Sequence, residues 1–321
     1  GSEMCIRDSP FTVQLTEQGV QPGDSCLLAV MTDNSDDKNF PPGKRQYTLD
    51  FAYHGGIYRD VWMIGKSSVA ITDALEADKV AGGGVFVHFD NISGKKAEVY
   101  VDTEVHNSGK RTRTVAVETV LVDAGDVPVK RVSQQVKLQA GESKTVRQRF
   151  AVRNPKLWSP DSPYLYRIQS RVKAGHEVLD GGVTRVGIRK AEFKGKDGFW
   201  LNGKPFGQLV GANRHQDFAY VGNALPNSQQ WRDAKRLRDA GCTIIRVAHY
   251  PQDPAFMDAC DEMGLFVIVA TPGWQYWNKN PEFAKLVHRN TREMIRRDRN
   301  HPSVLMWEPI LNETPYPVSY T

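Results

Sequence analysis

The sequence predicts a multidomain chain: part of one β-domain, then an immunoglobulin-like β-sandwich, then the N-terminal half of a (β/α)8 TIM barrel. The length of 321 residues suits two or three domains. Up to about residue 183, short runs alternate apolar and polar residues between turn signals, which is typical of half-buried strands. After about residue 190, continuous apolar runs alternate with helical patterns, which indicates a parallel sheet.

The beginning of the chain has two parts. Residues 1–10 (GSEMCIRDSP) do not join naturally to the sequence after them, and we interpret them as a cloning scar or an assembly artefact. Residues 11–66 hold a few strand-like runs and a polar, Pro-rich loop at 33–43. These are too few for an independent domain, so we expect the C-terminal part of another β-domain there.

Residues 67–188 are expected to form the immunoglobulin-like sandwich. Strand-like runs occur at 84–89 (GVFVHF), 98–105 (EVYVDTEV), 114–122 (TVAVETVLV), 144–152 (KTVRQRFAV) and 164–172 (YLYRIQSRV). Turn residues such as those at 91–94, 107–109 and 123–126 separate them. Short strands at this spacing favour an antiparallel sandwich.

Residues 189–321 are expected to form the first half of the barrel. Apolar strand runs lie at 208–211, 243–247, 265–270 and 303–307, with helical patterns at 228–240, 253–263 and 282–297. Asp253 and Pro254 are a typical helix start, and Gly241 and Gly264 are typical helix stops. Because no dinucleotide-binding glycine pattern is present, a barrel is favoured over a doubly wound sheet. A complete barrel needs ~250 residues, so this region supplies half of one.

Composition excludes several classes of protein. Hydrophobic residues are 40% and charged residues 25%, as in an ordinary soluble globular protein, and no apolar run reaches the ~18 residues of a membrane span. Lys+Arg 42 against Asp+Glu 37 gives a net charge of +5, which is too thinly spread to imply a nucleic-acid partner. The four cysteines form no CxxC pair, so we expect neither a disulfide framework nor a structural zinc site.

Polar side chains follow each predicted barrel strand, where active sites of such barrels lie. They are Asn213, Arg214, His215 and Asp217; Arg246, His249 and Tyr250; Thr271, Trp274 and Trp277; and Glu308, Asn312 and Glu313. Aromatic faces stack on sugar rings, amide and charged groups bind hydroxyls, and a tuned carboxylic acid can donate a proton. The combination suits glycoside hydrolysis, which needs two carboxylates.

Each of these residues also has a structural alternative. Glu313 can be an exposed loop carboxylate, and His215 and His249 can be structural histidines. Arg246 can support other side chains through an ion pair, and Glu308 can be a buried, paired carboxylate at a strand end. The tryptophans at 274 and 277 can cap the barrel rim. Residues and spacing by themselves leave these alternatives open.

Four motifs resemble glycoside hydrolase family 2, and they occur in that family's order and spacing. Residues 296–313 (RRDRNHPSVLMWEPILNE) resemble its acid/base signature, 243–251 (TIIRVAHYP) its strand-two motif and 211–217 (GANRHQD) its strand-one motif. Residues 56–61 (GIYRDV) are similar to the segment that closes its N-terminal sugar-binding sandwich. The resemblance covers about residues 12–317.

The resemblance implies a retaining exo-β-glycosidase built from a jelly-roll domain, an immunoglobulin-like domain and a barrel. Residues 11–66 would then be the C-terminal part of the sugar-binding jelly roll. Glu313 matches the general acid/base, and Asn312 matches the amide that holds the sugar's 2-hydroxyl group. The other substrate-binding residues that the resemblance implies are His215, His249 and Asp50, and the supporting residue that it implies is Arg246. From their positions at and after the predicted strands, we also expect Trp274 to bind substrate and Trp307 and Tyr250 to support the site.

The sequence also departs from the family pattern. The commoner text before the catalytic pair is Trp-Ser-Leu-Gly-Asn-Glu, whereas Trp307–Glu313 is one residue longer and includes Glu308. The third strand ends in Ala270–Trp274 (ATPGW) rather than an acidic pair. The family's nucleophile is a glutamate on the seventh strand, so we expect this chain by itself to be catalytically inactive. No metal-ligand set is complete, although the resemblance allows Mg or Na.

The predicted partner is an oligosaccharide or polysaccharide substrate, with no nucleic acid and no membrane, and a homo-oligomer is compatible with the family. The two histidines favour β-galactosides, and β-glucuronides and β-mannosides are alternatives. A non-catalytic carbohydrate-binding sandwich protein is a rival from another class. An unrelated lyase or metal hydrolase is disfavoured because HExxH and HxxxH spacings are absent from the sequence.

Overall fold

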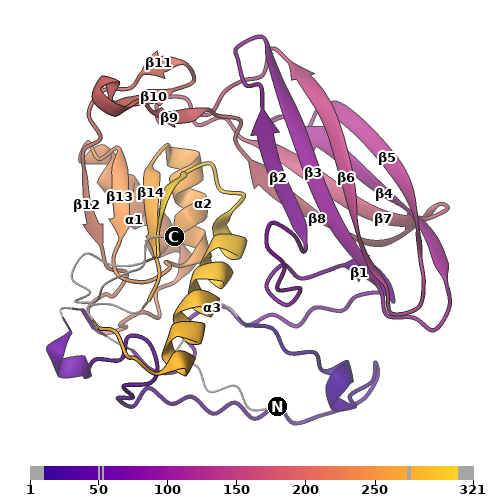
Figure 1. The fold of residues 1–321 in the computed structure, drawn as a ribbon, viewed down its shortest axis with the longest axis horizontal. Helices are drawn as coiled ribbons and strands as arrows, with labels where there is room; N and C mark the ends of the chain where they lie inside the picture. Colours follow the sequence, from indigo (N-terminus) through magenta and orange to yellow (C-terminus); the bar gives the residue numbers. More distant parts are fainter. Residues whose placement is uncertain (1–10, 50, 53, 273–275, 310–321) are drawn as a thin grey trace.

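The computed structural model describes residues 11–49, 51–52, 54–272 and 276–309. In this part of the chain a β-sandwich lies beside a parallel sheet that carries helices on one side (Figure 1). No helix among these residues is both long and apolar enough to cross a membrane.

The sandwich consists of two antiparallel sheets. The first contains β1 (Val69–Ile71), β2 (Val85–Asp90), β3 (Lys96–Asn107) and β6 (Ser143–Arg153). The second has the order β5-β4-β7-β8, with β4 (Arg113–Val122), β5 (Pro128–Leu138), β7 (Tyr166–Ala174) and β8 (Glu177–Val186). Alternate side chains point inward, so Val99 and Val101 of β3 pack with Leu121 and Ile168 of the facing sheet. All five strands expected from alternation are present.

Residues 11–66 differ from the expectation. Their described part forms two 3-10 turns, Thr16–Gln18 and Gln46–Thr48, and no strand. The expected strands of a partial jelly roll are therefore absent from these residues. Apolar side chains of the strand-like runs are exposed, with Leu27 at 95% and Trp62 at 77%. A strand needs a neighbouring chain to satisfy its backbone groups, and the described residues supply none to these runs.

The parallel sheet has the order β12-β13-β14-β15. It confirms the predicted strands, except that the first lies about three residues later than expected, so Asn213 and Arg214 are part of the strand rather than after it. The described strands do not close into a barrel. Its strands are β12 (Gly211–Arg214), β13 (Ile244–Val247), β14 (Phe266–Ala270) and β15 (Val304–Glu308), and its helices are α1 (Asn227–Asp239), α2 (Pro254–Met263) and α3 (Pro281–Asp298). Ile245 and Val267 pack with Ala234, Phe256 and Met294 of the helices. The alternate strand residues therefore face the opposite, open side.

A small antiparallel sheet links the sandwich to the parallel sheet. It contains β9 (Ala191–Phe193), β10 (Phe199–Leu201) and β11 (Lys204–Pro205), in the order β11-β10-β9. Phe199 and Leu201 form a buried cluster with Trp158 and Phe266, the first residue of β14. This sheet packs apolar side chains where the strands of the parallel sheet begin, away from the ends where we expect the site.

Side chains of both domains fix the sandwich against the parallel sheet. The side chain of Asn300 accepts a hydrogen bond from the Val87 backbone N–H at 3.0 Å and donates one to the Val85 carbonyl at 2.9 Å. Gly264 ends α2 with φ +72°, and a Cβ there would lie 2.1 Å from the Pro160 carbonyl oxygen. Only glycine suits this position, because both the backbone angle and the close approach of the sandwich chain require it.

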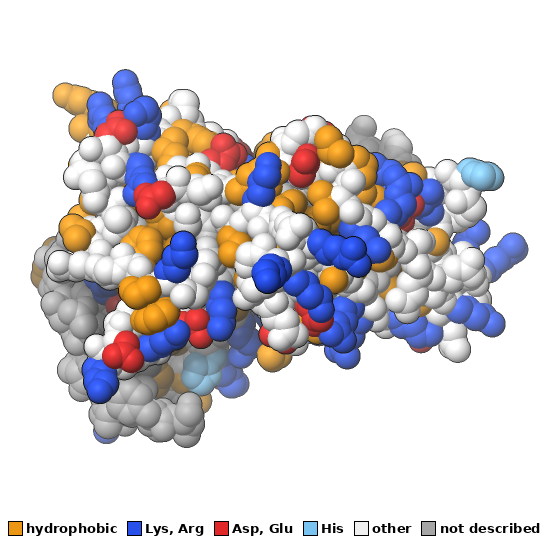
Figure 2. Space-filling model, turned by 90° about the horizontal axis from the view of Figure 1, so that it is seen from above, with side chains coloured by type: hydrophobic (Ala, Val, Ile, Leu, Met, Phe, Trp, Pro, Cys, Tyr) orange, Lys and Arg blue, Asp and Glu red, His pale blue; other side chains and the backbone are white. Residues whose placement is uncertain are grey.

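The surface carries positive side chains in many places. On the face shown in Figure 2, lysines and arginines are interspersed with apolar, polar and acidic side chains. This dispersal agrees with the small net charge of +5.

Candidate active site

Four rings meet at the carboxyl end of the parallel sheet. His215 follows β12, and His249 and Tyr250 follow β13. The imidazole centroids of His215 and His249 lie 5.4 Å apart, and the Tyr250 ring lies 6.4 Å from that of His215. Phe51 lies 6.1 Å from His215, 5.6 Å from His249 and 5.9 Å from Tyr250, measured between ring centroids. We call Phe51, His215, His249 and Tyr250 the ring cluster.

The N-terminal segment reaches this rim. Leu49 and Phe51 pack against Ala270, the last residue of β14. Arg59 belongs to the GIYRDV motif, and its guanidinium donates a hydrogen bond of 2.7 Å to the backbone carbonyl oxygen of Pro251. Pro251 directly follows His249 and Tyr250 in the chain. Asp50 lies outside the described residues, although both of its neighbours, Leu49 and Phe51, lie at the rim. The sequence did not predict Phe51 or Arg59 as site residues. The GIYRDV motif marked the segment around Arg59, whereas no pattern marked Phe51.

A buried polar network supports the ring cluster from the helix side. The Arg214 guanidinium donates to Gln230 Oε1 at 2.8 Å and to Asp233 Oδ2 at 2.7 Å, both on α1. It also donates to the Gln252 side chain and lies 4.0 Å from the Phe256 ring centroid. Arg214 was expected among the polar groups of the rim, but its buried side chain turns toward the helices instead.

Gln216 joins the two loops that carry the histidines. Its backbone N–H donates to the Tyr250 hydroxyl at 3.3 Å, and its side-chain oxygen accepts from the Asp253 backbone N–H at 3.0 Å. Asp253 in turn caps α2 by accepting from the Ala255 N–H at 2.8 Å. These bonds tie the loop after β12 to the loop after β13, so they fix the relative positions of His215 and His249.

Arg246 and Glu308 form a bidentate ion pair on the open face of the sheet. Arg246 Nε donates to Glu308 Oε2 at 2.8 Å, and Nη2 donates to Oε1 at 2.7 Å. An open hollow of about 460 Å³ lies against this face and is lined by Asn213, Arg246 and Ile268 among others.

The remaining residues expected at the site do not join the ring cluster or the Arg246–Glu308 pair among the described residues. Glu313, Asn312 and Trp274 lie outside the described residues. Trp307 was expected to support the site, but it packs with the helix-side core around Val267 and Val269. The register explains this position, because Trp307 pairs with Val269 whereas Glu308 pairs with Ala270, so they face opposite sides of the sheet. The Trp277 ring lies 5.9 Å from that of Phe283 at the start of α3.

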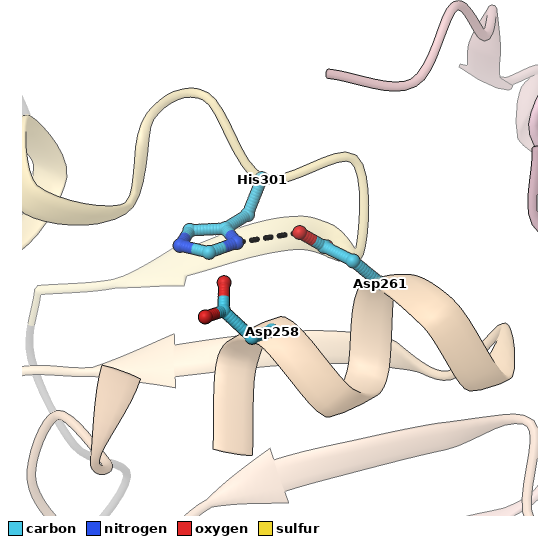
Figure 3. A group of neighbouring side chains, drawn as sticks. All are labelled: Asp258, Asp261 and His301. Atoms are coloured by element: carbon cyan, nitrogen blue, oxygen red, sulfur yellow. Dashed lines mark hydrogen bonds and ion pairs between the residues drawn. The ribbon is translucent and has the colours of Figure 1, made fainter. Parts of the chain in front are cut away.

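Among the described residues, one group of side chains is close enough together to hold a metal ion: Asp258, Asp261 and His301 (Figure 3). His301 Nδ1 lies 2.6 Å from Asp261 Oδ2, and Asp261 Oδ1 accepts from the Ser303 N–H at 3.0 Å. Arg185 of the sandwich pairs with Asp258. The group lies between α2 and the segment before β15, so its observed role is to join structural elements.

A magnesium or sodium site at the rim does not fit the described residues. The Glu308 carboxylate is held by Arg246, and the ring cluster offers imidazoles rather than the oxygen ligands that these ions prefer. No catalytic step is therefore assigned to a metal ion. The described cysteines, Cys26, Cys242 and Cys260, form no disulfide among themselves.

Comparisons with known proteins agree with the architecture. The model of the family described as glycosyl hydrolases family 2 matches residues 84–189, and that of the same family's TIM barrel domain matches residues 192–320. The chain is similar to a β-galactosidase of Thermoanaerobacter pseudethanolicus, with 34% identity over 95% of the chain and 39% of the relative. It is also 32% identical to a putative β-glucuronidase of Formosa agariphila, over 92% of the chain and 33% of the relative.

The chain also resembles solved structures of proteins with related names. Bacteroides uniformis β-glucuronidase 2, covalently bound to cyclophellitol-6-carboxylate aziridine, has a TM-score of 0.80 and 30% identity over 88% of this chain and 33% of that one. This chain spans about two fifths of the length of the curated β-galactosidases it matches, 39% and 40% in two of them. Because two models of one family match successive parts of the chain that correspond to the sandwich and the parallel sheet, the chain belongs to glycosyl hydrolase family 2.

Proposed function

We propose that the protein containing this chain is a retaining exo-β-glycosidase that hydrolyses terminal β-linked sugars, with β-galactosides as its substrates. The observation that carries the proposal is the ring cluster beside the Arg246–Glu308 pair at the carboxyl end of a parallel sheet. Aromatic rings contact the apolar faces of sugars, and imidazole and guanidinium groups bind hydroxyls. This end of the sheet is where barrel enzymes carry their active sites.

The proposed mechanism uses two carboxylates. Glu313 protonates the glycosidic oxygen while a second glutamate attacks the anomeric carbon, so the alcohol leaves and a glycosyl ester forms. Glu313 then removes a proton from a water molecule that attacks the same carbon, which frees the sugar with its configuration retained. The two carboxyl groups would lie ~5–5.5 Å apart. Asn312 would hold the 2-hydroxyl group through both steps.

The histidines favour galactosides in this proposal. His215 and His249 match substrate-binding histidines of the β-galactosidases, and relatives named β-galactosidase are among the most similar proteins. Relatives named β-glucuronidase are the main alternative within the family. A sandwich protein that binds carbohydrate without cleaving it is the alternative from another class.

Aryl β-glycosides test the proposal on the protein expressed from its complete gene. Wild type should cleave an aryl β-galactoside with retention, which NMR of the released sugar detects. Glu313→Gln should abolish turnover of substrates with poor leaving groups, whereas activated aryl glycosides should lose less, because they need little protonation. Glu282→Gln is a matched control, since Glu282 is an exposed residue of α3 that pairs with Lys285.

The outcomes separate the alternatives. Equal losses on both kinds of leaving group would contradict the acid role of Glu313. A folded wild type that binds galactose but cleaves none of the aryl β-galactoside, β-glucuronide and β-mannoside would favour the carbohydrate-binding alternative. Faster cleavage of the β-glucuronide than of the β-galactoside would replace the proposed substrate.

A further inference from the structure

The two sheets of the sandwich differ in charge. The four strands of the second sheet, β5-β4-β7-β8, contain eight lysines and arginines and three acidic residues. The four strands of the first sheet contain five lysines and arginines and four acidic residues. The excess positive charge of the sandwich strands therefore belongs mainly to the second sheet.

The outer side of the second sheet places three cations around one carboxylate. Val117 of β4 packs in the sandwich core, so its neighbour Glu118 points to the outer side. Arg171 of β7 is directly opposite Glu118 in the register. Arg131 of β5 and Lys173 of β7 lie at diagonal positions beside it. We call Arg131, Arg171 and Lys173, with Glu118 at their centre, the basic cluster.

The three cations of the basic cluster share one carboxylate at long distances. The Glu118 carboxylate oxygens lie 3.5 Å from Arg131 Nη1, 3.6 Å from Arg171 Nη1 and 4.0 Å from Lys173 Nζ. Arg171 also donates to the neutral Gln169 side chain at 3.1 Å. Among the described residues, Glu118 is the one carboxylate that pairs with any of these cations, so the cluster has a net charge of +2.

The cations are open to solvent, whereas the carboxylate between them is covered. The side chains of Arg131, Arg171 and Lys173 are 59%, 42% and 29% exposed. The side chain of Glu118 is 9% exposed. Gln135 of β5, the other diagonal neighbour of Glu118 on that strand, is exposed as well. A ligand on this side of the sheet would therefore meet positively charged N–H donors and an amide.

The other charged groups of the second sheet have partners elsewhere or lie apart from the cluster. Asp180 of β8 accepts a hydrogen bond from the backbone of β1, and Glu177 begins β8 at the turn after β7. Arg167 pairs with Asp126 at 2.6 Å. Arg185 pairs with carboxylates of α2. The unbalanced positive charge of this side of the sheet therefore includes the basic cluster.

We propose that the basic cluster binds an anionic polysaccharide. Sulfate or carboxylate groups of the polymer pair with Arg131, Arg171 and Lys173, because a guanidinium presents the donor pair that planar or tetrahedral oxyanions accept. Sugar hydroxyl groups bond to the amide of Gln135. Anionic groups that recur along one chain bind together more tightly than any one of them. The cluster belongs to the sandwich rather than to the candidate active site, so this binding does not depend on catalysis.

Other anionic partners fit the basic cluster less well. The bases of single-stranded nucleic acids stack on aromatic side chains, and the residues beside the cluster, Ser133, Gln135 and Gln169, are polar and not aromatic. An interface with an acidic protein usually has an apolar and aromatic centre. The centre here is a carboxylate among cations.

Dextran sulfate tests the proposal on the protein expressed from its complete gene, with uncharged dextran as the matched polymer. Affinity electrophoresis measures the two dissociation constants. Wild type should bind dextran sulfate and should not bind dextran. The triple variant Arg131→Gln, Arg171→Gln, Lys173→Gln should bind dextran sulfate about tenfold or more weakly, because three ion pairs with sulfate are lost. Glu118→Gln should bind it several-fold more tightly, because the negative charge at the centre is removed.

The control variant removes the same number of positive charges from the first sheet. It is Lys96→Gln, Arg147→Gln, Arg149→Gln, whose cations are likewise exposed and pair with Glu98 or Asp102. Its dissociation constant should stay within about twofold of wild type, because these cations lie on the other sheet. Equal weakening in the two triple variants would overturn the proposal, since the overall charge of the protein would then account for binding.

The remaining outcomes are also decisive. Equal binding of dextran and dextran sulfate would overturn the proposal, and so would Glu118→Gln that binds no more tightly than wild type. Tighter binding of duplex DNA than of dextran sulfate would replace the polysaccharide by a nucleic acid. Urea denaturation checks that each variant is folded. If the triple variant is not folded, Arg131→Gln should weaken binding while Glu118→Gln strengthens it, and any other pair of results would contradict the proposal.

Discussion

The indole N–H of Trp158 donates a hydrogen bond of 2.8 Å to the backbone carbonyl oxygen of Asp261. Trp158 lies between β6 and β7 of the sandwich, whereas Asp261 is on α2 beside the parallel sheet. The tryptophan is fully buried, and its ring lies 5.4 Å from that of Phe266 in an edge-to-face arrangement. The sandwich therefore contributes a core residue to the domain that carries the candidate site.

Replacing Trp158 by Phe should lower the free energy of unfolding by ~1–3 kcal/mol, because a buried hydrogen bond and part of the ring volume are lost. Urea denaturation of the variant and wild type measures the change. Trp200→Phe is the control, since the half-buried Trp200 donates to the Asp197 carbonyl at 3.1 Å in a hydrogen bond that is open to solvent. Its effect should stay below ~0.5 kcal/mol. Equal effects in the two variants would show that the burial of Trp158 is unimportant.

Replacing Arg214 by Met should destabilise the chain by ~3–5 kcal/mol. Methionine fills part of the space but leaves Asp233 without its cation and Gln230 and Gln252 without their donor, and an uncompensated buried charge is costly. Arg232→Met is the control, because Arg232 is on the same helix as Asp233 and bonds to Gln229 at an exposed position. Denaturant titration of both variants measures the difference. A loss below ~1 kcal/mol for Arg214→Met would contradict the structural role of the network.

Phe51 is expected to shield the histidines of the ring cluster. Phe51→Ala should increase the reactivity of His215 and His249 toward diethyl pyrocarbonate several-fold, because the ring that contacts both imidazoles is removed. Mass spectrometry of the modified peptides measures each histidine separately. Phe193→Ala is the control, since Phe193 lies on β9 and contacts Phe199. No change in labelling at either histidine would mean that Phe51 does not cover them.

The sequence correctly predicted the strands and helices in which apolar residues occupy the positions that the fold buries. The strands of the parallel sheet read as apolar runs because Val267 and Val269 face helices while Ile268 lines the hollow on the open side. Strand β5 was missed because most of its side chains are exposed and only Val132, Val136 and Leu138 mark its inner face. Strands β9 to β11 were missed because two or three residues are too few for a period to show.

The candidate site was predicted in part for a similar reason. Residues that directly follow the strands of a parallel sheet lie at the same edge of that sheet. His215, His249 and Tyr250 therefore lie close together, as expected. It does not give the direction of a long side chain, and Arg214 turns to the helices because Asp233 is there. The pairing of Arg246 with Glu308 depends on the register of β13, β14 and β15, which spacing along the chain does not reveal.

His301 should make stability depend on pH. Burial lowers the pKa of its imidazole, but the adjacent Asp261 carboxylate, with smaller contributions from Asp298 and Asp258, outweighs burial and raises the pKa to about 9. Arginines pair with two of these carboxylates, Arg185 with Asp258 and Arg297 with Asp298. Because the folded pKa exceeds the unfolded value of ~6.5, protonated His301 stabilises the fold fully below pH ~6.5. That contribution is lost as the pH rises through about 9.

The free energy of unfolding should therefore fall by ~1–3 kcal/mol between pH 6.5 and 9, with the lower end favoured because the His301 side chain is 18% exposed. Denaturant titrations at several pH values measure the slope. His301→Gln should flatten it, since glutamine can bond to Asp261 but carries no titrating proton. His176→Gln should keep the wild-type slope, because His176 is exposed in the turn between β7 and β8. Identical slopes in wild type and His301→Gln would show that the ion pair between His301 and Asp261 does not hold the helix to the segment before β15.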